Sequence, residues 1–307
     1  MANSAPPSSA AAAERPLIGI LLMVGAMSVV PFMDSIAKQL SDHIPILQVV
    51  WARYFFHFCL ILPVALLRYG PRQLLPKQQS LQLLRGALLL ASTILFFAAI
   101  ARMPMADALA LIFVSPLIVT TLSPWVLGET VGARRRIAVL VGFFGAMLII
   151  RPGFGTIQWP ALLALGAGIV FGLYFLATRR LAGSAPPLVT LTYTAAVGAL
   201  VMSLTVPLVW VTPSLLDLGA MALMGLIAAC GHFLLIKSFE FASASLLAPF
   251  TYSEIIMTTL LGFVFFGDFP DRWTWAGITV IICSGVYISI RERATGATPS
   301  QPPNEPL

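Results

Sequence analysis

Long apolar runs separated by short polar segments fill the chain between residues 17 and 290. A helix needs about 20 apolar residues to cross a bilayer core, and the runs lack the alternation of barrel strands. The pattern predicts an all-α membrane protein with ten transmembrane helices, at residues 17–40, 46–68, 81–102, 104–125, 134–151, 159–180, 188–210, 216–239, 244–266 and 273–290. The polar ends, residues 1–16 and 292–307, are predicted to be disordered cytoplasmic tails.

The second half of the chain repeats the first. The segment 102–151 recurs about 139 positions later, so that Thr120 matches Thr259 and Gly128-Glu129 matches Gly267-Asp268. Five spans per copy would place the second copy upside down in the membrane. We therefore expect two inverted five-helix repeats, residues 17–151 and 159–291, joined by a linker at 152–158 and arranged around a central cavity. Secondary transporters are commonly built in this way.

Composition and charge agree with a membrane protein. The chain is 59% hydrophobic and 10% charged, too apolar for a soluble domain. If the N-terminus is cytoplasmic, 13 of the Lys and Arg residues lie on the inner side and 4 on the outer side, with Arg53 inside a span. The positive-inside rule then predicts a multi-pass protein with both termini cytoplasmic. The net charge of +6 is explained by this topology, so the lipid bilayer and not nucleic acid is the expected partner.

Several classes of chemistry have no signature here. No nucleotide-binding loop, nucleophile elbow or metalloprotease motif is present, and the three cysteines lie at unrelated positions. We expect no enzyme activity, no metal and no cofactor; an intramembrane enzyme is the alternative from another class. The ratio of 15 Arg to 3 Lys is typical of a GC-rich genome and favours a bacterial inner membrane.

Three short motifs accompany the ten spans: Ser115-Pro116 in the fourth, Gly128-Glu129 at its end and Gly267-Asp268 at the end of the ninth. With the repeat, they resemble the drug/metabolite transporter superfamily in its EamA-type branch. The resemblance implies a ten-helix basket whose central cavity is lined by the first four helices of each copy. It also implies peripheral fifth and tenth helices able to support a homodimer.

Members of this superfamily export amino acids and other metabolites, and the YddG type exports aromatic amino acids. Others import metabolites such as S-adenosylmethionine or exchange nucleotide sugars. The chain departs from the family in its ninth span, where Glu254-Ile255 replaces the frequent Glu-Pro and the nearest proline is Pro249. We therefore expect any kink there to be displaced toward the start of the helix.

Glu254 is the first candidate for substrate binding, because it lies near the middle of the ninth span, where a charge is costly. Thr251 and Thr258 fall on its face of a continuous helix. Glu254 is interpreted as a proton acceptor or as an anchor for a substrate ammonium group. The alternative is a protonated side chain that hydrogen-bonds a neighbouring helix.

Arg53 and His57 share a face of the second span. Arg53 either binds a substrate carboxylate or snorkels to the interface. His57, His232 and Asp34 are candidates for coupling or gating: they could form a relay with Glu254, but an interhelical histidine or a pair with Arg53 would explain them equally well.

Aromatic residues on the cavity-lining spans would give an amphipathic substrate an apolar pocket with a few polar anchors. The candidate contacts beyond those already named are Trp51, Phe97, Ser115, Tyr174, Tyr193 and Tyr252. Pro116 is the candidate hinge. The small residues Ala138, Gly142 and Ala146, with Gly277 and Gly285, predict a packing or dimer seam.

These observations predict a secondary transporter that exports amino acids or related small amphipathic metabolites by alternating access. Uptake of a zwitterionic or cationic metabolite by the same architecture is the alternative.

Overall fold

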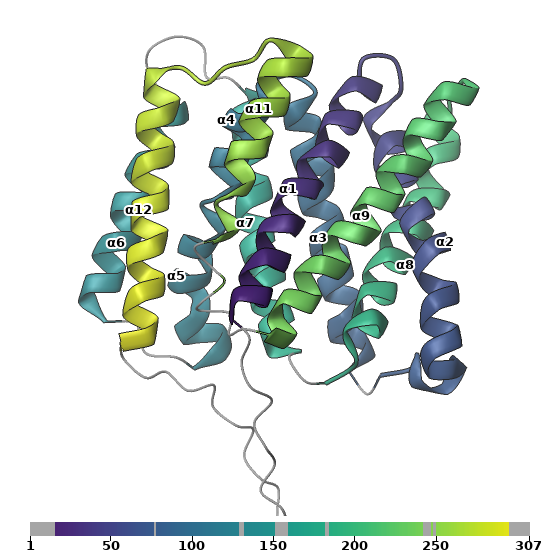
Figure 1. Ribbon diagram of the computed structural model, residues 1–307, viewed down its shortest axis with the longest axis horizontal. Coiled ribbons are helices and arrows are strands. Elements are labelled where there is room, and N and C mark those ends of the chain that lie inside the picture. The colour runs from purple at the N-terminus through teal and green to yellow at the C-terminus, as the bar shows by residue number, and fades with distance from the viewer. Residues whose placement is uncertain are drawn as a thin grey trace, which may run out of the picture.

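The computed structural model describes residues 16–76, 78–128, 132–150, 159–181, 184–241, 247 and 250–294. This part of the chain is helical and contains no strand. The first copy contributes α1 (Pro16–Leu40), α2 (Ile46–Gln73), α3 (Gln79–Ile100), α4 (Met105–Ile112), α5 (Ser115–Leu127) and α6 (Ala133–Ile150). The second contributes α7 (Trp159–Arg180), α8 (Pro187–Thr205), a short 3₁₀ helix (Val206–Val209), α9 (Leu215–Phe241), α11 (Glu254–Phe266) and α12 (Arg272–Ala294). Figure 1 shows these helices running roughly parallel and antiparallel to one another.

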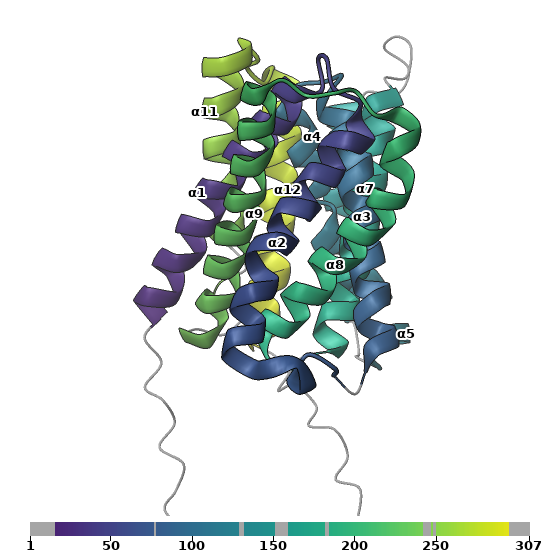
Figure 2. The ribbon, with the colours of Figure 1, turned by 90° about the vertical axis from the view of Figure 1, so that its right-hand side faces the viewer.

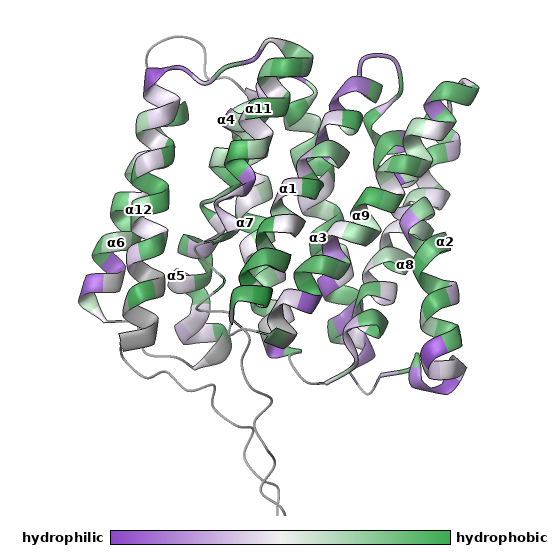
Figure 3. Ribbon diagram, viewed as in Figure 1, coloured by the Kyte–Doolittle hydropathy of each residue, from purple (hydrophilic) through white to green (hydrophobic). Residues whose placement is uncertain are grey.

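Membrane-length helices dominate the fold. Seven segments in the described part of the chain are long and apolar enough to cross a bilayer, including Met105–Val126, which spans α4 and α5. The apolar stretches Arg136–Ile150 and Glu254–Phe266 are shorter. The prediction of ten spans is therefore supported for seven of them. Hydrophobic residues predominate along the helices in Figure 3, and many large ones, such as Leu67 and Leu204, are exposed, as a lipid-facing surface requires.

The internal repeat is visible in the broken fourth and ninth spans. The helices α5 and α11 each have 13 residues, and both begin directly after a non-helical step, at Phe113–Val114 and at Tyr252–Ser253. Each ends at a left-handed glycine, Gly128 with φ 70° and Gly267 with φ 69°. Glycine adopts this conformation without steric cost and caps helix C-termini for that reason. The two helices start 139 residues apart, which is the sequence offset of the repeat.

The two copies pack mainly against each other. The most extensive contacts pair α1 with α9, α7 with α3, α2 with α8 and α6 with α12. In Figures 1 and 2, α1 begins at the lower end of the molecule, whereas its counterpart α7 begins at the upper end. The α1–α9 contact and the α7–α3 contact are therefore equivalent under the inversion. One large hydrophobic core runs through residues of both copies.

The helices α6 and α12 lie side by side at one edge of the bundle (Figure 1). A Cβ atom on Gly277 would lie 2.6 Å from the carbonyl oxygen of Gly145, and Ser284 donates a hydrogen bond to the carbonyl of Ala138. Gly142 and Ala146 are buried as well. These residues thus form a seam between two helices of one chain, because only small side chains allow this approach. Gly285, also predicted for the seam, faces the Tyr252 side chain instead.

Candidate functional site

Arg53 is the centre of a polar cluster built from both copies. It lies in the second turn of α2 and is only 6% exposed. Its Nη1 donates to Thr93 Oγ1 on α3, and its Nη2 lies 3.4 Å from Nε2 of His232 on α9. The guanidinium also lies 5.0 Å from the ring centre of Tyr54 and 5.7 Å from that of Phe97. The side chain therefore points into the bundle, and the snorkelling alternative is wrong.

The hydrogen-bonding capacity of Arg53 is only partly used. A guanidinium has five N–H donors, and two of them are directed at Thr93 and His232. The buried Nε has no partner. Within the described chain no carboxylate lies at ion-pair distance from Arg53. Three donors thus remain for a ligand, and carboxylates match their geometry best.

One acidic side chain lies near this guanidinium, and a second lies near the first. Asp34 on α1 is buried and interacts electrostatically with Arg53. Glu254, the first residue of α11, interacts electrostatically with Asp34. Glu254 is half-buried, so part of its surface stays accessible. Asp34 therefore links Arg53 to Glu254, and the charges of a zwitterionic ligand would complement those of the two ends.

The chain around Glu254 differs from the expected continuous helix. The ninth span breaks at Tyr252–Ser253, directly before Glu254, so Thr251 does not continue the α11 face. Thr258 keeps its place one turn beyond Glu254; it is buried, and its Oγ1 has no partner. The break occupies the position equivalent to the one before Ser115, whereas Pro249, toward which a kink was expected to be displaced, lies outside the described residues.

The equivalent break in the first copy lies where the sequence indicated a hinge. Ser115 begins α5 and is buried, and Pro116 occupies the first turn of the helix. Proline lacks an N–H and is tolerated there, since that donor has no helical partner. Pro116 therefore marks the start of a half-helix.

The two intramembrane histidines lie close together. The ring centres of His57 and His232 are 5.9 Å apart. His57 is buried and its Nε2 has no partner, whereas His232 is half-buried and contacts Arg53. The contact of His232 with Arg53 fits the alternative in which these two residues pair, and a relay with Glu254 stays a prediction.

The predicted aromatic contacts divide into separate groups. Tyr252 forms an edge-to-face pair with Phe113, with ring centres 5.0 Å apart, beside the two helix breaks. Phe97 joins the Arg53 cluster. Trp51 instead donates to Ser203 and stacks on Phe55, so it points away from Arg53.

Tyr174 and Tyr193 also lie outside the Arg53 cluster. Tyr193 is half-buried, and Tyr174 belongs to a second polar cluster centred on Arg85. Sequence reasoning missed Arg85, which was counted among the charges near the cytoplasmic surface. It is 5% exposed and contacts α7 and α8. The available signal was that Arg85 falls several residues inside an apolar span.

An ion pair crosses between the copies at the upper end of the molecule. Lys38 Nζ on α1 lies 3.1 Å from Asp268 Oδ2, just after α11, and donates to the carbonyl of Met103 at 2.8 Å. The contact thereby ties α1 and the turn before α4 to the chain just after α11. We call this contact the upper latch.

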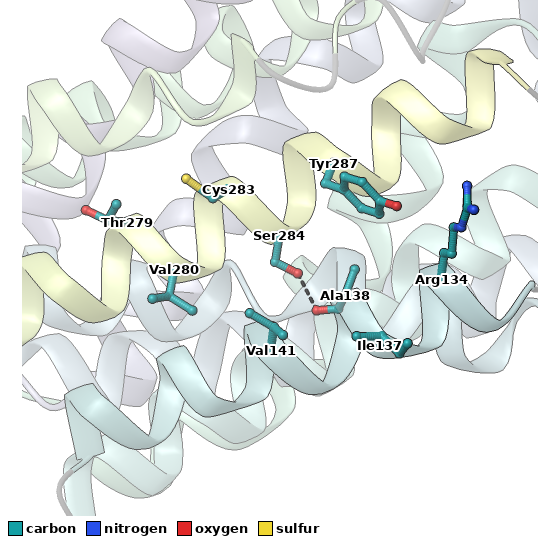
Figure 4. Close-up of a pocket in the computed structure, with 9 residues that line it drawn as sticks. All are labelled: Arg134, Ile137, Ala138, Val141, Thr279, Val280, Cys283, Ser284 and Tyr287. Carbon is teal, nitrogen blue, oxygen red and sulfur yellow. Dashed lines mark hydrogen bonds between the residues drawn. The ribbon is translucent and has the colours of Figure 1, made fainter.

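A groove of about 590 Å³ lies between α6 and α12, at the edge of the bundle (Figure 4). Its lining is mainly apolar, with Arg134 and Tyr287 at one end. None of the predicted site residues lines it. This groove is therefore separate from the polar clusters. Among the described residues, no group of His, Cys, Asp or Glu is placed to hold a metal ion.

Comparison with known proteins identifies the architecture. The model of the EamA-like transporter family matches twice, at residues 17–151 and 158–290, which are the two copies. An S-adenosylmethionine uptake transporter of Rickettsia prowazekii is 26% identical, with 85% of this chain and 88% of the relative covered. A riboflavin transporter of Vibrio cholerae is 30% identical, with 90% and 94% covered. The pseudopaline exporter CntI of Pseudomonas aeruginosa is 27% identical, with 88% and 95% covered.

A solved crystal structure supports the same fold. It matches with a TM-score of 0.63 at 18% identity, over 89% of this chain and 98% of the other. The named relatives are all transporters, in agreement with the prediction that the protein is not an enzyme. The two family matches cover nearly all of the apolar sequence, and the fold has several membrane-length helices. The chain is thus an integral membrane transporter that belongs to the EamA-like transporter family.

Proposed function

We propose that this transporter moves small zwitterionic metabolites, such as amino acids, across the bacterial cytoplasmic membrane by alternating access. Arg53 binds the carboxylate of the substrate, and Glu254, with Asp34 behind it, binds the ammonium group. The observation that carries this proposal is a buried guanidinium with three unused donors, near Asp34, which in turn lies near Glu254 of the second copy.

The same geometry supports a role for His232 in coupling. Its Nε2 lies 3.4 Å from Nη2 of the guanidinium that would bind substrate, and a neutral imidazole nitrogen can accept a hydrogen bond from that group. A change in substrate occupancy at Arg53 would therefore change the environment of His232. Three further residues complete the proposed site. The ring of His57 lies beside His232, the hydroxyl of Thr258 has no hydrogen-bond partner, and Pro116 is the proposed hinge.

Export is the direction that the sequence predicts. Uptake is a second candidate, and similarity to S-adenosylmethionine uptake transporters over 85% of the chain favours it. The proposed topology has both termini in the cytoplasm, with the lower end of Figure 1 on that side. The outer faces of α6 and α12 are the proposed homodimer contact, testable by cross-linking through the exposed Cys283.

Transport by purified protein in liposomes tests the proposal directly. Vesicles would be loaded with labelled amino acids, S-adenosylmethionine or riboflavin, inside in one set and outside in another. We expect saturable flux of at least one zwitterion without a change in its mass. Flux of riboflavin alone, or conversion of any compound, would refute the proposed substrate class or the proposed function.

Charge-neutral variants then test the site. We expect Arg53→Gln and Glu254→Gln to reduce flux by more than tenfold while the proteins still purify as folded species. Arg102→Gln is the matched control, since Arg102 is exposed at the end of α3. Wild-type flux in both site variants would remove these residues from the mechanism.

A further inference from the structure

Arg85 on α3 carries a second buried guanidinium, separate from that of Arg53 on α2. It lies six residues after the start of α3 and donates from Nε to Thr178 Oγ1 at 2.8 Å. Its Nη2 donates to the Tyr174 hydroxyl at 2.6 Å, and its Nη1 donates to Thr194 Oγ1 and to the carbonyl of Thr190. The guanidinium also lies 4.6 Å from the ring centre of Tyr174. All of these partners are electrically neutral.

The charge of Arg85 is therefore not compensated within the part of the protein that the structure describes. The ion pairs found there join Lys38 to Asp268 and His43 to Asp217, both away from α3. Asp34 and Glu254 interact with the Arg53 cluster instead. An intramembrane charge without a counterion is costly and marks an ion or substrate pathway more often than a packing site.

Arg85 and Thr93, the contact of Arg53, both lie on α3 and are eight residues apart, which is about 12 Å along the helix and about 80° around it. In Figure 1 α3 starts at the lower end of the molecule, and Arg85 is nearer to that start than Thr93 is. The electrostatic influence of Arg85 reaches Tyr54 and His232 in the upper cluster.

The second copy has no counterpart of Arg85. The residue 139 positions later is Met224, which is buried and apolar. The packing shared by the two copies can thus be made without a charge at this position. The inverted repeat would make the lower and upper halves of the molecule alike at this position. Arg85 makes them different, because only the first copy carries a charge there.

From these observations we propose that Arg85 is a second anion-binding station for the substrate carboxylate, between Arg53 and the lower end of the bundle. One N–H of Nη2 is still available, and exchange of the Tyr174 hydroxyl for a carboxylate oxygen would free a second donor on the same nitrogen. A carboxylate would replace a neutral partner by a charged one. This inference deepens the proposed function and rests on it.

The test compares two ligands that differ only in the carboxylate. The labelled amino acid with the highest flux in liposomes and its carboxamide, for example phenylalanine and phenylalaninamide, would be measured by equilibrium binding to purified protein. We expect Arg85→Gln to weaken binding of the carboxylate ligand about tenfold and to change binding of the carboxamide less than twofold. We expect Arg85→Lys, which keeps the charge, to fall between the wild type and Arg85→Gln.

A structural role for Arg85 predicts a different result. If its hydrogen bonds only held α3 against α7 and α8, Arg85→Gln would weaken both ligands equally or neither, and this result would overturn the proposal. Gln82→Met is the matched control, because Gln82 is also buried on α3 and bonds Thr190 on α8 without a charge. We expect this variant to keep the wild-type preference for carboxylate. Zwitterion flux in the wild type, measured separately, shows whether the underlying transport function holds.

Discussion

Replacing Thr93 with valine would remove one hydroxyl from the Arg53 cluster while keeping the shape of the side chain. Thr93 Oγ1 accepts a hydrogen bond from Arg53 and lies 2.9 Å from the Tyr54 hydroxyl. It also donates to the carbonyl of Leu89 within its own helix. The variant would therefore lose the tertiary bonds that orient Arg53 and Tyr54.

The size of the effect follows from these two bonds. Hydrogen bonds between membrane helices average about 0.6 kcal/mol and reach about 1.7 kcal/mol, and a bond to a charged group contributes more than a neutral one. We expect Thr93→Val to lower the free energy of unfolding by about 1–3 kcal/mol. If the lost hydrogen bonds hold Arg53 in its binding orientation, substrate affinity should fall as well, by up to about tenfold for each 1.4 kcal/mol that is lost.

The assay pairs denaturation in detergent with flux in liposomes. Thr192→Val is the matched control, because Thr192 is also buried in a membrane helix and its hydroxyl bonds only the carbonyl of Leu188 one turn earlier. We expect flux to fall at least about fivefold in Thr93→Val, which corresponds to about 1 kcal/mol, and to stay within about twofold in Thr192→Val. Equal flux in the two variants would refute the idea that Thr93 positions Arg53.

Other features give shorter tests. Lys38→Gln should break the upper latch. Because the ion pair is partly exposed, the free energy of unfolding should change by less than about 1 kcal/mol. A cysteine placed beside Asp268 should be modified faster in this variant, and an unchanged labelling rate would argue against a latch. Gly277→Val should destabilise the α6–α12 contact by about 1–3 kcal/mol through overpacking. Gly25→Ala, with nothing within 4 Å of the added atom, should not destabilise the protein, and similar melting temperatures for these two glycine variants would contradict the close approach. Gly267→Ala should cost about 1–2 kcal/mol, because alanine is strained at the left-handed φ of 69°, and a wild-type melting temperature would exclude such a cap.

Much of the fold could be predicted from the sequence because the strongest signals are local. Apolar runs fixed the helices to within a few residues, and the Gly128 and Gly267 caps repeat at a constant offset. Arg53 and His232 could be nominated individually as polar residues in apolar helices. Their contact could not, because it depends on how α2 and α9 from different copies are rotated against each other.

The failures have physical causes of the same kind. The break before Glu254 has no proline at the break itself, and only its equivalence with Ser115 through the repeat could have located it. Arg85 lies near a span end, where hydropathy alone cannot separate a charge facing water from one buried against α7 and α8. Trp51 was grouped with the site by its place in the second span, although its ring faces the end of α8.

The interrupted fourth and ninth spans have a consequence for motion. In Figure 1, α5 occupies the lower half of the molecule and α11 the upper half. Both breaks are bridged by tightened turns, in which Val114 bonds Leu111 and Ser253 bonds Phe250 three residues back. Each half-helix can therefore tilt about its own joint while its internal hydrogen bonds stay intact. We expect opening toward one compartment to require reorientation of one of these two short helices, while the other helices of the bundle keep their positions.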